Sequence, residues 1–178
     1  VALNLEAYSF GEGTLEEIAP PGPGPAPDVM NWSWLEYGNR IGAWRLRDAF
    51  RDLAMPCTLL VNSEVYAHCP ELPQAFQSDG HEIGAHGRTN SELQGNLPEA
   101  EEAALIASAT RAIAAGSGKR PAGWLGPWIS ESLVTPDLLQ EAGYTYLLDW
   151  CHDDQPVWMK TRKGRILSVP YPQELNDI

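Results

Sequence analysis

The stretch GHEIGAHGRTN, from Gly80 to Asn90, contains a short apolar segment that ends in a histidine. His81 and His86 are five residues apart, so they cannot share one face of a helix. On a strand an odd spacing places them on opposite faces. A helical zinc motif is therefore excluded. The stretch predicts a strand with His86 at its carboxyl end and Asn90 four residues further on.

Short apolar runs alternate with helical patterns on both sides of this stretch. Such alternation is typical of parallel β/α units, whose strands are buried on both faces. Residues 8–38 include a run rich in proline and glycine and are expected to form an irregular loop. We expect one α/β domain over residues 1–178, with strands at 1–7, 56–62, 81–86, 120–126, 144–150 and 166–172 and helices at 39–55, 69–80, 97–118 and 135–143.

The charge balance limits the partners of the chain. It has 24 acidic against 12 basic residues and a net charge of -12, which argues against nucleic acid, whose phosphates require a basic surface. No run of eighteen apolar residues is present, so no membrane span is expected. Cys57, Cys69 and Cys151 are odd in number and widely spaced, which favours a reducing cytoplasm over a disulfide framework or a zinc site.

Polar side chains gather where the expected strands end. In a β/α barrel, the carboxyl ends of the strands form the active-site face. We therefore expect one site at this face, built from residues among Asn4, Glu6, Asn62, His86, Trp124, the run 149–154 and Tyr171.

Four segments resemble a known family. GHEIGAHGRTNSEL, RPAGWLGPW, GYTYLLDW and DDQPVW occur in the order and spacing of the polysaccharide deacetylase (NodB-homology) superfamily. RPAGW and DDQPVW are most similar to its allantoinase-like and cyclic imide hydrolase branch. The resemblance implies a distorted (β/α) barrel of about six to seven parallel strands that hydrolyses C–N bonds in acetamido sugars or small cyclic amides. Members are longer, so we expect this chain to be truncated at both ends and its open barrel edge to be covered by further residues or by a second copy in a homo-oligomer.

The resemblance carries over to the metal site only in part. Metal-dependent members use a first-strand aspartate and an H-x-x-x-H pair, which here fall on Glu6, His86 and Asn90, and the aspartate that serves as base falls on Asn4. A zinc site usually has three good protein ligands and an open water position. An asparagine offers only a neutral carbonyl and cannot accept a proton. A divalent metal such as zinc on Glu6, His86 and Asn90, or no cofactor at all, both remain open at this point.

Without a complete ligand set, other groups must supply the acid and the base. Glu6 is the first candidate base, because an apolar pocket raises the pKa of a carboxyl group. His86 is expected to orient the water or protonate the leaving nitrogen, and Asp153 to hold a histidine in the right tautomer. Backbone N–H groups of the turn at 123–126 are expected to stabilise the oxyanion. The substrate-binding residues are expected to be Asn4, Arg40, Trp124, Asp154 and Tyr171.

Less specific interpretations stand beside these. His86 can be a satisfied core histidine, and Glu6 can form a structural salt bridge to Arg40 or Arg120. We predict a hydrolase of non-peptide C–N bonds, with small linear or cyclic amides ahead of N-acetylated sugars. The alternatives are a metal-dependent polysaccharide deacetylase and an inactive module that binds sugars or amides.

Overall fold

Seven strands form one sheet in the computed structural model, which describes residues 1–15 and 26–176. Their order across the sheet is β1-β2-β3-β4-β5-β7-β6. All neighbours are parallel except β6 and β7. The strands are β1 (Ala2–Leu5), β2 (Thr58–Val61), β3 (Glu82–Ala85), β4 (Gly123–Trp124), β5 (Tyr146–Leu147), β6 (Val157–Thr161) and β7 (Gly164–Ser168).

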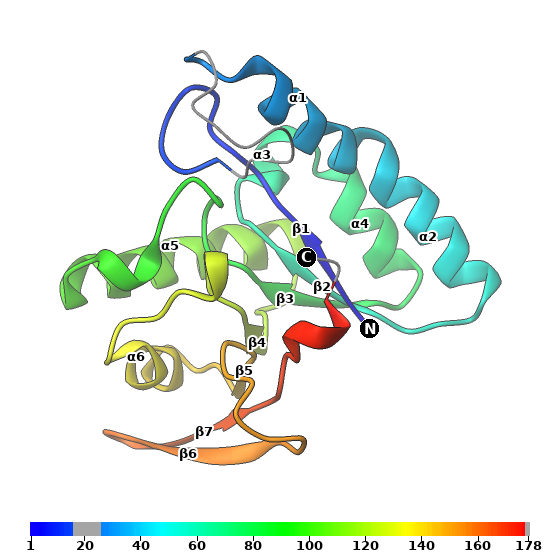
Figure 1. The fold of residues 1–178 in the computed structure, drawn as a ribbon. Helices are drawn as coiled ribbons and strands as arrows, with labels where there is room; N and C mark the ends of the chain where they lie inside the picture. Colours follow the sequence, from blue (N-terminus) through cyan, green and yellow to red (C-terminus); the bar gives the residue numbers. More distant parts are fainter. Residues whose placement is uncertain (16–25, 177–178) are drawn as a thin grey trace.

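Helices cover the outer side of the curved sheet (Figure 1). Apolar side chains of α2, α4, α5 and α6 pack with those of the strands in the main core, for example Phe50, Phe76, Ile106 and Leu139. The α-helices are α1 (Val29–Tyr37), α2 (Ala43–Asp52), α3 (Val65–His68), α4 (Glu71–Ser78), α5 (Glu99–Ser117) and α6 (Thr135–Glu141), and a π-helical turn (Gly38–Gly42) joins α1 to α2.

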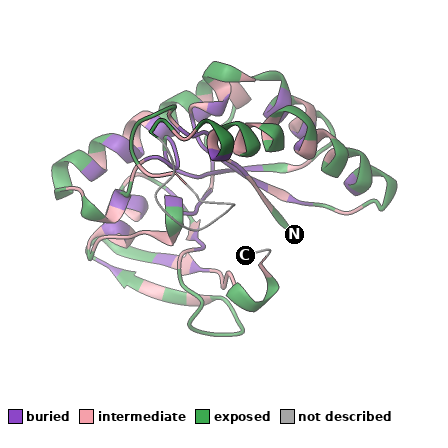
Figure 2. Ribbon diagram, turned by 45° about the horizontal axis from the view of Figure 1, so that its top comes forward, coloured by how far each residue is buried: buried purple, intermediate pink, exposed green. Residues whose placement is uncertain are grey.

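Alternation along each strand separates the helix-facing side from the barrel interior. Odd-numbered Leu59, Val61 and Ala85 belong to the main core under the helices. A second, smaller cluster lies on the opposite face, inside the curve of the sheet, and consists of Leu60, Leu125 and Leu148. Buried residues accordingly concentrate on the strands and on the inner sides of the helices (Figure 2). Side chains that follow the strands on the interior face therefore meet at one rim.

The expected irregular loop at 8–38 is wrong over its last part, where α1 forms. Asp28 starts this helix, since its side chain accepts a hydrogen bond from the backbone N–H of Asn31 at 3.0 Å. No proline follows Pro27 until Pro56, so nothing interrupts the helix. Most of the proline- and glycine-rich run, at residues 16–25, lies outside the described residues.

The expected parallel barrel also needs correction at one edge. β6 was not anticipated, and only two residues, Arg162 and Lys163, connect it to β7. A two-residue connection permits only an antiparallel hairpin. Within the described part of the chain the barrel is not closed, because β1 and β6 are the two ends of the sheet order.

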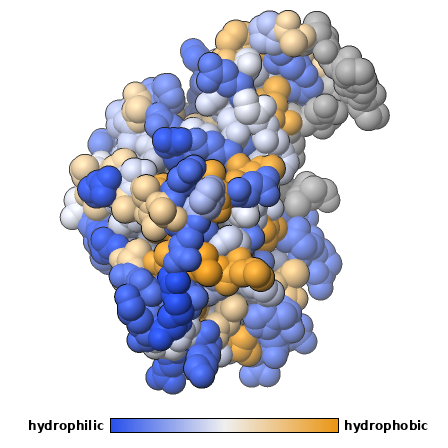
Figure 3. Space-filling view, turned by 90° about the vertical axis from the view of Figure 1, so that its left-hand side faces the viewer, coloured by the Kyte–Doolittle hydropathy of each residue, from blue (hydrophilic) through white to orange (hydrophobic). Residues whose placement is uncertain are grey.

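The surface seen in Figure 3 is largely hydrophilic, with one hydrophobic patch near its centre. Among the described helices, none combines the length and the apolar character needed to cross a lipid bilayer. The three cysteines are free.

Candidate active site

The residues that follow the first four strands on the interior face meet at one rim of the sheet. Glu6 follows β1, Asn62 follows β2, His86 follows β3 and Leu125 follows β4. Because these strands are parallel neighbours, their carboxyl ends lie side by side. The structure thus brings the first-strand carboxylate and the mid-chain imidazole together, with 3.4 Å between Oε1 of Glu6 and Nε2 of His86.

The orientation of the His86 ring is fixed on its far side. The ring is buried, and its Nδ1 lies 2.8 Å from the carbonyl oxygen of Leu125. A carbonyl can only accept, so Nδ1 carries a proton and Nε2 is the ring nitrogen that faces Glu6. Nε2 has no directed hydrogen bond among the described residues, although it faces the Glu6 carboxylate. A proton on Nε2 satisfies both groups.

The pKa of the Glu6 carboxyl group is shifted downward, opposite to the expected direction. Burial raises its pKa. The hydrogen bond and charge of His86, together with hydrogen bonds from Tyr8 and Asn90, lower the pKa by more than burial raises it, so the net shift is downward. The Tyr8 hydroxyl donates to Oε2 of Glu6 at 2.9 Å. Glu6 is therefore a carboxylate at neutral pH, paired with His86 rather than with Arg40 or Arg120.

Asn62 ties three strand ends together. Its Oδ1 accepts from the backbone N–H of Ala7 at 2.8 Å. Its Nδ2 donates to the backbone carbonyl of His86 and to Oδ1 of Asn90, the latter at 3.2 Å. This amide fixes the backbone next to both Glu6 and His86. Sequence reasoning placed Asn62 at the rim but gave it no role.

The residues expected to bind a metal supply two good zinc ligands and one neutral amide oxygen. Oδ1 of Asn90, the only oxygen that it could offer, already accepts from Asn62, and its Nδ2 lies 3.4 Å from the Tyr8 hydroxyl. No group of three or more His, Cys, Asp or Glu side chains suited to a metal occurs in the described ranges. Glu6 and His86 remain as two good ligands, one fewer than a zinc centre usually has.

Asn4 lies on the interior face of β1, two residues before Glu6. Its Oδ1 is buried without a hydrogen-bond donor among the residues described. A buried carbonyl oxygen of this kind seeks a donor, so Asn4 is suited to accept from a substrate N–H.

Trp124 does not line a pocket, contrary to the expectation. The strand alternation turns its side chain into the main core, where it is fully buried and meets Tyr144 edge to face at 5.3 Å. The turn after it is not free to bind an oxyanion either. The N–H of Leu125 donates to the carbonyl of Ala85 at 2.9 Å, and the N–H of Gly126 donates to Oδ1 of Asp149 at 2.6 Å.

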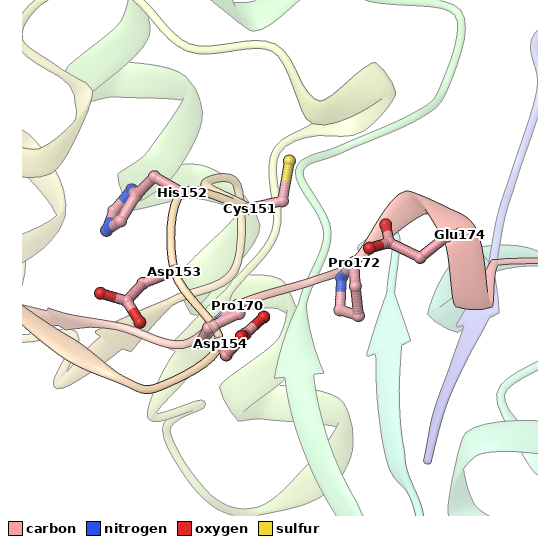
Figure 4. A pocket seen from close by; sticks show the side chains of 7 residues that line it. All are labelled: Cys151, His152, Asp153, Asp154, Pro170, Pro172 and Glu174. Carbon is pink, nitrogen blue, oxygen red and sulfur yellow. The ribbon is translucent and has the colours of Figure 1, made fainter.

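Asp153 and Asp154 lie in the loop between β5 and β6. Oδ1 of Asp153 accepts from the backbone N–H of Gln155 at 3.1 Å, so it stabilises its own turn instead of holding His86. In Figure 4, His152 and Asp153 point to one side of the loop and Glu174 lies on the other. A cavity of about 420 Å³ lies at this loop and is lined by Cys151, His152, Asp153, Asp154, Pro170, Pro172 and Glu174.

The other two expected substrate residues lie apart from each other. Tyr171 is half-buried and packs on the Leu60, Leu125 and Leu148 cluster inside the barrel. Arg40 is exposed and lines a cavity of about 330 Å³ on the other side of the β1 end, with Ala7, Glu36, Asn39, Trp44, Val65, His68, Cys69 and Glu71.

Two half-buried carboxyl groups at the same rim were not recognised from the sequence as a pair. Asp149 follows β5, and Glu131 lies in the segment between β4 and α6. Burial and the neighbouring negative charge raise the pKa of Asp149 well above its usual range. Burial also raises the pKa of Glu131 to about 7. A single aspartate after a strand gives no signal of such a pair, because its partner comes from a different segment.

Comparisons with known proteins agree with this architecture. The sequence model of the family described as Polysaccharide deacetylase matches residues 35–147. A peptidoglycan deacetylase from Helicobacter pylori is 28% identical over 118 residues, which are 66% of this chain and 40% of that protein.

Two solved structures superpose on the whole fold. Puue allantoinase has a TM-score of 0.83 at 29% identity, and a "probable polysaccharide deacetylase" from Pseudomonas aeruginosa has a TM-score of 0.82 at 31% identity. In both cases the match covers 99% of this chain and 62% of the other. The chain thus spans between about two fifths and three fifths of the length of these relatives.

Proposed function

This chain belongs to the polysaccharide deacetylase family, and from that premise we propose that it hydrolyses non-peptide carbon–nitrogen bonds. The observation that carries the proposal is the Glu6–His86 pair, a carboxylate and an imidazole 3.4 Å apart at the rim where the parallel strands end. A histidine with a packing role alone needs no carboxylate partner, whereas here Nε2 faces an ionised carboxylate at the strand-end rim.

The pair can move a proton during amide hydrolysis. In the form of the pair in which Nε2 is unprotonated, a water hydrogen-bonded to Nε2 of His86 attacks the carbonyl carbon of the substrate, and its proton passes to Nε2. The imidazolium that forms lies next to the Glu6 carboxylate, which stabilises it. When the C–N bond breaks, Nε2 returns the proton to the leaving nitrogen. The Leu125 carbonyl keeps the ring in the required tautomer throughout.

The substrate is proposed from two similarities and one feature of the site. A relative is named for peptidoglycan and a structural neighbour for allantoin, so acetylated sugars and small cyclic amides are both candidates. We place small amides first because the rim holds two good metal ligands rather than three, as noted above. A cytoplasmic location, which the free cysteines favour, stays a prediction.

The test compares activity on two substrate panels, one of N-acetylated sugar oligomers and one of small linear and cyclic amides. Each assay runs with added zinc and with a chelator. We expect Glu6→Gln and His86→Gln to lose activity by about 10²–10⁴-fold, the usual contribution of general acid–base catalysis. The matched controls are Glu101→Gln, on the exposed face of α5, and His81→Gln, at the opposite end of β3.

The outcomes separate the alternatives. An active parent whose Glu6 and His86 variants keep its rate contradicts the assignment of the pair. Activity that needs zinc and favours acetylated sugars supports the metal-dependent deacetylase. A folded parent that binds sugars or amides without cleaving them supports the inactive binding module.

A further inference from the structure

The two carboxyl groups of Glu131 and Asp149 are each held at one oxygen and left unsatisfied at the other. Oδ1 of Asp149 accepts from the N–H of Gly126 at 2.6 Å, and Oε2 of Glu131 accepts from Nε1 of Trp150 at 2.8 Å. Oδ2 of Asp149 and Oε1 of Glu131 are buried and receive no hydrogen bond from any described residue.

Trp150, which donates to Oε2 of Glu131, is the residue after Asp149, so the two carboxyl groups lie next to each other, and the negative charge of Glu131 raises the pKa of Asp149. Two ionised carboxylates offer only acceptors and cannot hydrogen-bond to each other. One proton on either group turns the contact into a donor–acceptor pair and satisfies both unsatisfied oxygens.

We propose that Glu131 and Asp149 share one proton, and that this pair is a positioning device for His86. Asp149 accepts a hydrogen bond from the N–H of Gly126. The carbonyl of the same peptide unit, that of Leu125, accepts a hydrogen bond from Nδ1 of His86. The pair thereby fixes the peptide on which the tautomer of His86 depends.

The segment between β4 and Glu131 needs such a restraint because its backbone is strained. Trp128 and Ile129 have φ of 60° and 52°, a left-handed conformation that side chains other than glycine rarely adopt. The segment is tied elsewhere by Nε1 of Trp128, which donates to the carbonyl of Asn90 at 2.6 Å. Its other end is tied by Glu131. Strain of this kind persists only where the surroundings hold both ends.

The electrostatic surroundings determine the direction of the pH dependence. Glu102 of α5 is the other acidic group that acts on Glu131, and it is fully buried among Gln94, Ser132 and Thr135. His152 lies against the Trp150 ring, 6.0 Å between centroids. Negative neighbours and burial both favour the protonated pair, so the pair loses its proton only as the pH rises above neutrality. The His86 support then weakens.

The test follows the ring nitrogens of His86 by NMR in protein labelled with ¹⁵N-histidine, from about pH 5 to about pH 9. The His86 signal is assigned by its loss in His86→Gln. In the parent we expect the Nδ1–H signal to shift or broaden as the pair ionises. In Glu131→Gln an amide N–H replaces the shared proton permanently, so this alkaline change should disappear. Glu101→Gln is the control and should behave as the parent does.

The contact of His86 with Glu6 is common to all variants, so the difference between the curves is the reading. Asp149→Asn provides a second amide variant, since its Oδ1 can still accept from Gly126. An alkaline change that persists in both amide variants, or is missing from the parent, overturns the proposal. So does failure of both amide variants to fold, because each retains a bridging hydrogen. Loss of the alkaline change on adding calcium or magnesium ions to the parent would show that a cation, not a proton, occupies the pair.

This readout does not require an active enzyme, so it stands or fails apart from the proposed function. If the chain is active, the same ionisation should appear as a fall of kcat at alkaline pH in the parent. In Glu131→Gln that fall should move to higher pH or vanish, with KM unchanged.

Discussion

Replacing Asn62 by alanine should destabilise the fold more than any other single change at the rim. The substitution removes three hydrogen bonds at once and leaves the N–H of Ala7, the carbonyl of His86 and Oδ1 of Asn90 without this partner. Asn62 is fully buried. A buried polar group that loses its partner costs about 1–3 kcal/mol. Water entering the space left by the amide keeps the sum near the lower end, so we expect a loss of about 3–5 kcal/mol.

This loss is a large part of the roughly 5–15 kcal/mol by which domains are usually stable, so urea unfolding followed by circular dichroism will detect it. The matched control is Asn96→Ala, whose side chain is exposed in the turn after Gln94. It should change the free energy of unfolding by less than about 0.5 kcal/mol. Amide hydrogen exchange gives a local check, because the N–H of Ala7 should exchange faster in Asn62→Ala.

A loss below about 1 kcal/mol for Asn62→Ala would refute the reasoning. It would mean that the three groups find other partners as easily as they find Asn62. Unchanged exchange at Ala7 would point the same way, even if the overall stability fell.

Three further predictions test other parts of the structure. Gly123→Ala places a Cβ in the ring of Tyr146 inside the barrel and should cost about 1–3 kcal/mol, measured by thermal or urea unfolding. The pKa of Glu131 is raised from 4.5 to about 7 in the folded protein, so the folded state binds more protons than the unfolded state. The free energy of unfolding should therefore fall by on the order of 3 kcal/mol as the pH rises through that window. Glu131→Gln should lack this part of the pH dependence, and an identical pH dependence in both proteins would contradict the shift. Trp124→Leu should lower stability by about 2–4 kcal/mol while KM stays unchanged, whereas a raised KM at full stability would restore Trp124 to the substrate pocket.

Much of the architecture could be predicted because local pattern is a property of the chain itself. Apolar runs such as 56–62 and 81–86 mark strands that are buried on both faces, and their alternation with helical segments indicates parallel order. The parallel order in turn places the residues after each strand at one rim. Glu6 and His86 were therefore expected together, and the structure has them 3.4 Å apart.

Two errors concern side chains whose surroundings in the folded protein differ from the expected ones. The pKa of Glu6 was expected to rise from burial, but His86, Tyr8 and Asn90 reverse the sign. Trp124 was assigned to the pocket wall because it lies at an expected strand end, yet its side chain points into the main core and packs against Tyr144.

The sequence by itself determined the strand and helix pattern, the parallel order of most of the sheet and the family, because these follow from local periodicity and short motifs. Only the tertiary structure decided which donor and acceptor groups already have hydrogen-bond partners. It showed that Asn90 is engaged by Asn62, and that Glu131 meets Asp149 across 18 residues of chain. Protonation and tautomer depend on the few atoms around each group, and folding alone brings those atoms together.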